Sequence, residues 1–151
     1  GSCAIPRLLF LGAEPVVLAS SLNAVVGQRI LRKFCSHCKE SFEPPEIIVK
    51  DIKDILGPLL TADKLKDGKF ILYRGKGCSE CGDSGFLGRV GIFEVLPITD
   101  KVAKLVLTRT DAETVEHQAV EEGMISLKQD GYLKAVEGVT TIEEVLRVAQ
   151  D

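Results

Sequence analysis

The sequence contains no tryptophan, only two tyrosines and no excess of basic residues. Its formal net charge is −3 and its pI is about 5.5, whereas nucleic-acid-binding domains usually carry a basic excess and interleaved aromatic side chains. No apolar run approaches the ~20 residues that a helix needs to cross a bilayer, and no signal peptide opens the chain. These absences argue against a nucleic-acid-binding protein, a membrane-spanning protein and a secreted protein.

What is present is typical of an ordinary globular protein. The 151 residues are 45% hydrophobic and 27% charged, which is enough for one domain, or one domain with a small appendage, to bury a core. Gly1 and Ser2 are typical of the remnant of a cleaved expression tag, which predicts that the natural chain begins further upstream.

The five cysteines are spaced in a way that indicates metal binding. Their odd number argues against a disulfide framework, and four of them form two C-x-x-C pairs, "CSHC" and "CSEC". Each pair is called a knuckle below. The two knuckles supply four sulfurs, a set that suits tetrahedral Zn²⁺, and the predicted ligands are Cys35, Cys38, Cys78 and Cys81.

The long separation of the two knuckles does not prevent a shared site. Between them lie 39 residues, more than the 15 to 20 of common zinc modules. Loop-closure entropy grows only with the logarithm of length, so widening the gap from about 17 residues costs roughly 0.7 kcal/mol. A structural zinc ion contributes on the order of 10 kcal/mol. A closed site of four thiolates has no open coordination position, so we expect it to stabilise structure and not to activate water.

Three alternatives to a zinc site stay open at this point. A thioredoxin-like redox pair would need a helix after its C-x-x-C, whereas Cys81 is followed by turn-forming residues, Gly82 to Gly85. Four unconnected reduced thiols, or iron in the same thiolate cage, are the other two. His37 lies inside the first knuckle but is not expected to be a ligand, His117 is expected to face solvent, and Cys3 has no nearby partner.

Several basic residues crowd the knuckles. Four thiolates around one Zn²⁺ carry a net charge of −2, which nearby cations could offset. A solvated basic surface is the competing interpretation. The residues concerned are Arg32, Lys33, Lys39, Lys76 and Arg89.

The first half of the chain predicts two short helices and a strand before the first knuckle. Residues 4–11 suit a helix that stops at Gly12, and Glu14 with Pro15 opens a second one. The stretch "LNAVVGQRILRKF" predicts a helix giving way to a strand that runs up to Cys35. Between the knuckles, an amphipathic helix bearing Ile52 stops at Gly57, and "KFILYR" predicts a strand.

The second half predicts one strand and four helices. "GRVGIFEVLPI" is a continuous apolar run, which is typical of a strand buried on both faces. Four helix starts follow, and capping boxes are expected at three of them. The residues expected to open these helices are Thr99, Thr110, Ser126 and Thr141, and the glycines expected to end two of them are Gly123 and Gly138.

At this point the residues show a family resemblance. The chain from about Ala4 to Val148 resembles the C-terminal portion of the type II secretion system protein E and type IV pilus assembly (extension) ATPases. Three stretches carry the resemblance: "AIPRLLFLGAEPVVLASSLNAVVGQRILRKFCSHCKE", "CSECGDSGFLGRVGIFEVLPI" and "EEGMISLKQDGYLKAVEGVTTIEEVLRV".

The resemblance implies an α/β fold, present here as an α+β portion: the C-terminal part of a RecA-like ATPase domain with an inserted four-cysteine zinc module and a C-terminal helical bundle. It further implies a homo-hexamer on the cytoplasmic face of the inner membrane, which couples ATP hydrolysis to extrusion of pilin or pseudopilin through an inner-membrane platform protein. The implied divisions are 4–34 for the partial ATPase core, 35–87 for the zinc insert, 88–98 for the returning strand and 99–151 for the helical subdomain.

The sequence contains none of the nucleotide-hydrolysing motifs of that family. No G-x-x-x-x-G-K-[ST] phosphate loop is present, because Phe70 and Gly77 stand where Ser or Thr must follow the two Gly–Lys pairs. We therefore expect no catalytic residue and no ATP or Mg²⁺ site in this chain, and no hydrolysis by it alone. The alternative function is a stand-alone zinc-ribbon adaptor that binds a protein or a nucleic acid.

Overall fold

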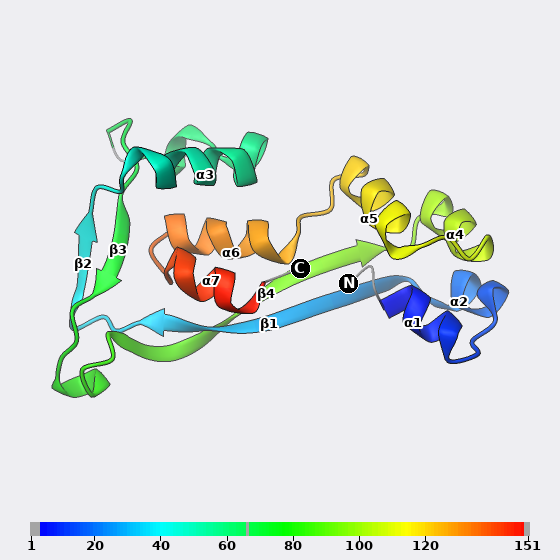
Figure 1. The fold of residues 1–151 in the computed structure, drawn as a ribbon, viewed down its shortest axis with the longest axis horizontal. Coiled ribbons are helices and arrows are strands. Elements are labelled where there is room, and N and C mark those ends of the chain that lie inside the picture. The colour runs from blue at the N-terminus through cyan, green and yellow to red at the C-terminus, as the bar shows by residue number, and fades with distance from the viewer. Residues whose placement is uncertain (1–3, 66, 150–151) are drawn as a thin grey trace. The chain divides into compact units, whose positions relative to one another are not determined.

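The computed structural model describes residues 4–65 and 67–149, and within these ranges it contains seven α-helices and four strands (Figure 1). This mixture of helix and strand agrees with the expected α+β composition. The expectations for Gly1, Ser2 and Cys3 fall outside the described residues. Within those residues, every helix is too short or too polar to cross a membrane.

The chain divides into two compact units, and each has its own hydrophobic core. Unit 1 comprises Gly1–Gly27 and Phe93–Ser126, and unit 2 comprises Gln28–Ile92 and Leu127–Asp151. The helices of 99–151, which the sequence groups in one subdomain, are therefore divided between the two units.

Strands β1 (Ala24–Phe34) and β4 (Phe86–Pro97) are hydrogen-bonded neighbours in a two-stranded sheet, and each contributes residues to both units. They run in opposite directions (Figure 1). The strand that enters the cysteine-bearing segment thus pairs with the strand that leaves it.

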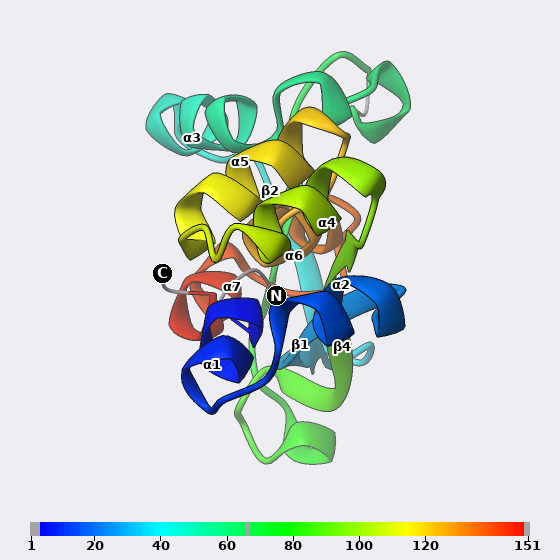
Figure 2. The same ribbon diagram turned by 90° about the vertical axis from the view of Figure 1, so that its right-hand side faces the viewer.

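Unit 1 is built mainly from four short helices. Helix α2 packs on α4, and α4 packs on α5, as Figure 2 shows from the end of the unit. Buried aliphatic side chains from every helix meet residues of β4 in the core: Ile5, Leu9, Leu18, Leu96, Val102, Val106, Val115, Ala119 and Met124. The helices are α1 (Ala4–Phe10), α2 (Pro15–Ser21), α4 (Asp100–Leu107) and α5 (Ala112–Glu121).

Unit 2 combines three helices with a pair of antiparallel strands that are joined by a long segment. This pair of strands is called the hairpin below, and in it Lys39 lies opposite Gly75. Helix α3 packs on α6, and α6 packs on α7 around a core that includes Ile52, Tyr132 and Val145. The elements are β2 (Lys39–Phe42), α3 (Glu46–Leu56), β3 (Leu72–Gly75), α6 (Leu127–Val136) and α7 (Ile142–Val148), with short 3₁₀ turns at Gly57–Leu59, Ala62–Lys64 and Ser79–Cys81.

Most helix ends agree with the sequence signals. The Thr99 hydroxyl accepts a hydrogen bond from the Val102 N–H, and the Thr141 hydroxyl accepts one from the Glu144 N–H. Stop glycines such as Gly12 have a positive φ, as a left-handed helix end requires. Local capping chemistry therefore sets these boundaries.

Three local details differ from the sequence expectations. Helix α2 ends at Ser21, so the helical start predicted for "LNAVVGQRILRKF" is wrong, and its β-branched residues form β1 instead. The cap of α5 is Asp111, whose carboxylate accepts from the Thr114 N–H at 2.9 Å, and not Thr110. The short polar strand β2 was missed, because it offers little apolar alternation.

Strand β4 is buried on one face only, so the prediction of burial on both faces is wrong. Ile92, Glu94 and Leu96 are buried, whereas the alternating Phe93 and Val95 are 45% and 49% exposed. The apolar run reads as continuous because the outward residues are also large and hydrophobic. Its sequence alone could not separate the two faces.

Replacement of Arg109 by glycine is expected to stabilise unit 1. Arg109 follows the C-cap of α4 in the left-handed region, with φ +52°, and its side chain is exposed. A Cβ is unfavourable in this conformation, so Arg109→Gly should raise the free energy of unfolding by about 0.5–1 kcal/mol in urea denaturation. Arg109→Ala removes the same side chain but keeps the Cβ and should change little. Equal effects of the two variants would contradict this explanation.

Replacement of Gly131 by alanine is expected to destabilise unit 2. A Cβ at Gly131 would lie 2.4 Å from Cγ1 of Val145, which is fully buried on α7. Overpacking costs about 1–3 kcal/mol, while the gain in helix propensity is about 1 kcal/mol, so the net loss should be about 1 kcal/mol. In a double-mutant cycle, Val145→Ala should relieve part of this cost, and strict additivity would refute the packing argument.

Candidate metal centre

The structure brings the four predicted cysteine ligands into one cluster. Their sulfur atoms all lie within 4.8 Å of one another. The Sγ–Sγ distance is 3.8 Å for Cys35–Cys78, 3.9 Å for Cys38–Cys81 and 3.7 Å for Cys78–Cys81. Four sulfurs at ~2.3 Å from a tetrahedral Zn²⁺ stand about 3.8 Å apart, whereas a disulfide needs about 2.05 Å. The cluster therefore has the spacing of a four-thiolate metal site.

Backbone hydrogen bonds join each knuckle to the chain of the other. The Lys76 N–H donates to the Cys38 carbonyl at 3.0 Å, next to the β2–β3 ladder. The Cys35 N–H donates to the Gly85 carbonyl, also at 3.0 Å. The hairpin thus closes the long gap in sequence and delivers both pairs of sulfurs to one place.

Three glycines make this close approach possible. A Cβ at Gly75 would lie 2.2 Å from the Gly85 carbonyl oxygen, and one at Gly77 would lie 2.7 Å from the Asp83 carbonyl oxygen. Gly85 itself has φ +76°. Because the obstructing atoms belong to the backbone, a side chain could not be accommodated by a change of rotamer.

The sulfurs are unequal in their local electrostatics. Burial raises the pKa of the Cys81 thiol, but the Cys78 and Gly85 N–H groups, which both donate to its sulfur at 3.3 Å, outweigh that effect and hold the pKa at about 6. Burial instead raises the pKa of Cys38 to about 12. Cys81 therefore ionises more readily than Cys38 before a metal adds its own charge.

The nearby basic residues mostly bind other partners. Lys39 donates to the Gly138 carbonyl and lies 4.1 Å from the centre of the Tyr73 ring, and Lys76 pairs with Glu40 at 2.6 Å. Arg32 binds Glu144. These three side chains are therefore not simply solvated. Their contacts are with other groups, and none of these contacts is with a cysteine sulfur.

His117 faces solvent, as the sequence predicts. His37 is exposed, and His117, with a side chain that is 77% exposed, stands 3.8 Å from Glu121. In the described parts of the chain, the metal-ligand grouping consists of the four cysteines alone. Cys3 lies outside those parts.

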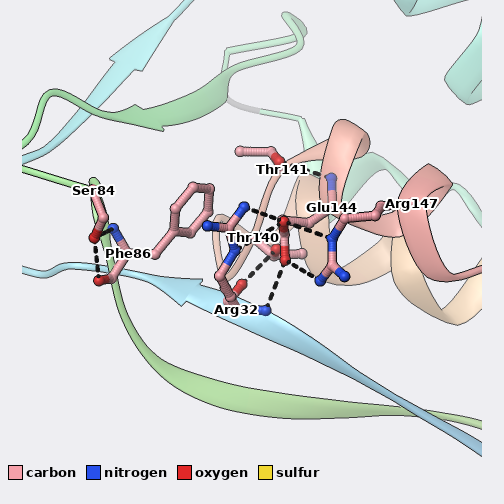
Figure 3. A network of polar contacts seen from close by, with 7 residues as sticks. All are labelled: Arg32, Ser84, Phe86, Thr140, Thr141, Glu144 and Arg147. Atoms are coloured by element: carbon pink, nitrogen blue, oxygen red, sulfur yellow. Dashed lines mark hydrogen bonds and ion pairs between the residues drawn. The ribbon is translucent and has the colours of Figure 1, made fainter.

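The sequence offers no indication of a buried carboxylate that binds Arg32, three residues before Cys35. Glu144 is 3% exposed, and its two oxygens accept hydrogen bonds from the Arg32 N–H, the Arg32 guanidinium and the Arg147 guanidinium (Figure 3). Burial raises its pKa, but the two arginines more than compensate and lower it to about 2. The sequence signal for Glu144 was read only as half of a helix cap.

A comparison with protein families places this geometry in context. The profile of the family described as type II/IV secretion system protein matches residues 2–147. The chain belongs to this family.

Its relatives are named as ATPases of pilus assembly and as components of secretion systems. The chain is 37% identical to the type IV pilus assembly ATPase PilB of Myxococcus xanthus over 94% of its own length, and 37% identical to that of Pseudomonas aeruginosa over 97%. It is 36% identical to the type II secretion system protein E of Pseudomonas aeruginosa over 98%. The matched part is 24%, 24% and 27% of these relatives, so the chain spans about a quarter of their length.

Proposed function

We propose that this chain is part of a motor ATPase that assembles type IV pili or drives type II secretion, and that its four cysteines hold a structural Zn²⁺. The observation that carries the zinc proposal is the sulfur cluster, in which two knuckles remote in sequence meet at the spacing of a tetrahedral thiolate site. The names of the relatives support the motor.

The proposed zinc would cross-link the two ends of the segment between β1 and β4, which contains the hairpin. Cys35 directly follows β1, and Cys81 lies shortly before β4. The ion would supply a cross-link between these two points, and four thiolates leave no coordination position for water or substrate. The residues around the site already favour this arrangement, because backbone N–H groups donate to the Cys81 sulfur.

The catalytic chemistry of the proposed motor would come from residues outside this chain. The sequence has no phosphate loop, so ATP and Mg²⁺ would bind elsewhere in the protein. On this proposal the protein works as a homo-hexamer at the cytoplasmic face of the inner membrane. It acts on pilin or pseudopilin through an inner-membrane platform protein, and unit 2 is a stabilising and coupling part.

Metal analysis and ATPase assays test this proposal together. The purified chain should contain about one zinc per molecule and hydrolyse no ATP, whereas the complete protein should do both. Replacing Cys35 and Cys78 by serine in the complete protein should abolish pilus assembly or secretion. ATP turnover by the 151-residue chain alone would show that the active site has been placed wrongly.

A further inference from the structure

Helix α7 is attached to the strand end that carries the first metal-site cysteine. The Arg32 N–H donates to Oε2 of Glu144 at 3.0 Å, and its guanidinium donates to Oε1 at 3.0 and 2.6 Å. The Thr140 hydroxyl donates to the Arg32 carbonyl at 2.8 Å, and the Phe34 N–H donates to the Val139 carbonyl at 3.0 Å. Arg32 and Phe34, which lie just before Cys35, are therefore held by α7 and the turn that precedes it.

The same arginine also contacts the segment that follows the second knuckle. The Arg32 guanidinium lies 4.3 Å from the centre of the Phe86 ring, and that ring stacks on Phe34 with centroids 5.9 Å apart. The Phe86 N–H donates to the Ser84 hydroxyl (Figure 3). That hydroxyl in turn donates to the Cys81 carbonyl. Arg32 thus bridges the chain that enters the sulfur cluster and the chain that leaves it.

Glu144 is the group that holds Arg32 in this position. Its carboxylate is buried, while the Arg32 side chain is 52% exposed and would otherwise be free to turn into solvent. The Nε and Nη2 N–H groups of Arg32 donate to the same carboxylate oxygen, Oε1, and this holds one edge of the planar guanidinium against Glu144. The plane of the guanidinium decides whether it can lie over the Phe86 ring.

We propose that Glu144 is a positioning residue for the metal centre. By fixing Arg32 it orders the segments that carry Cys35 and Cys81, so that metal binding and the docking of α7 support each other. This inference rests on the proposed metal site and adds to it a role for the C-terminal helix. Because linkage is reciprocal, loss of the Glu144 contact lowers the affinity for the metal, and loss of the metal weakens the packing of α7 on the strand end.

Zinc affinity measured by chelator competition at pH 7.4 tests this coupling. Glu144→Gln is expected to raise the zinc dissociation constant about 10-fold, in the range found when groups that support metal ligands are removed. Glu143→Gln changes an exposed neighbour, and Tyr132→Phe removes the 2.6 Å hydrogen bond to Asp51 elsewhere in unit 2. Both controls should bind zinc within twofold of the original chain.

The possible outcomes distinguish failure of the metal site from failure of the positioning role of Glu144. An original chain that binds no zinc would overturn the metal site itself. Zinc binding with an unchanged dissociation constant in Glu144→Gln would overturn the positioning role alone. Equal weakening in Tyr132→Phe would also overturn it, because a general loss of stability would then explain the result.

Hydrogen exchange on the unaltered chain provides a second test that does not depend on a variant folding. After zinc is removed by a chelator, amides of α7 should exchange at least 10-fold faster, while those of α4 and α5 in unit 1 should not change. Unchanged protection of α7 would refute the coupling. A uniform loss of protection that includes α3 would refute it equally, because no specific path through Arg32 would then be needed.

Discussion

Replacement of Cys78 by serine should remove zinc from the chain and unfold the hairpin that carries the knuckles. Cys78 stands 3.8 Å from the Cys35 sulfur and 3.7 Å from the Cys81 sulfur, so it links the two halves of the cluster. A structural zinc contributes on the order of 10 kcal/mol, more than the whole stability of many domains. Zinc content measured by mass spectrometry should fall from about one per chain to near zero, and thermal unfolding should begin at a much lower temperature.

Two variants provide matched controls for the loss of Cys78. His37→Ala removes the histidine inside the first knuckle, and Cys3→Ser removes the cysteine that lies outside both knuckles. Both variants should retain about one zinc per chain. An iron–thiolate site would absorb visible light, whereas Zn²⁺ with its filled d shell would not, so an absorption spectrum separates the two metals. Full zinc content in Cys78→Ser would show that the cluster is not the metal site.

Replacement of Glu144 by glutamine should cost about 3 kcal/mol at pH 7, and this cost should disappear in acid. The pKa of Glu144 is about 2 in the folded chain, against an ordinary value of 4.5. A carboxyl group with a lowered pKa stabilises the folded state above its unfolded pKa, and the contribution is lost as pH falls toward the folded pKa. The loss therefore occurs between about pH 5 and pH 2.

Urea unfolding of both proteins across that pH range checks the prediction. The difference in free energy of unfolding should shrink steadily from pH 5 downwards. Zinc is first removed from both proteins with a chelator, because Glu144→Gln is expected to weaken zinc binding, and the difference then reports on Glu144 alone. Glu143→Gln, at an exposed position, should stay within about 0.5 kcal/mol of the original chain at every pH. A difference for Glu144→Gln that does not change with pH would contradict the assignment.

The grouping of the four cysteines could be predicted because its signal is local and chemically specific. Two C-x-x-C pairs restrict the chemistry to metal binding or redox exchange, and the turn after Cys81 favours the former. The helix ends at Thr99 and Thr141 could be predicted for a similar reason, since a capping side chain binds a backbone group only three residues away. The family could be recognised from extended stretches that include the knuckles.

The role of Glu144 could not be predicted in this way. The capping pattern that begins at Thr141 accounts for its position in the sequence, and it does form with the Glu144 N–H. Its carboxylate, however, faces an arginine 112 residues earlier in the chain. No spacing rule connects residues so far apart, so this pairing becomes visible only when α7 is placed beside β1.

The sequence by itself thus indicated which four cysteines would group together, most helix boundaries and the family, since these depend on residue type and on interactions over a few positions. Tertiary structure alone decided which face of β4 is buried, how closely Gly75 approaches Gly85 and which carboxylate binds Arg32. The physical reason is that burial and long-range hydrogen bonding depend on which segments meet in space. That choice is made by the packing of the whole core and not by any one stretch of the chain.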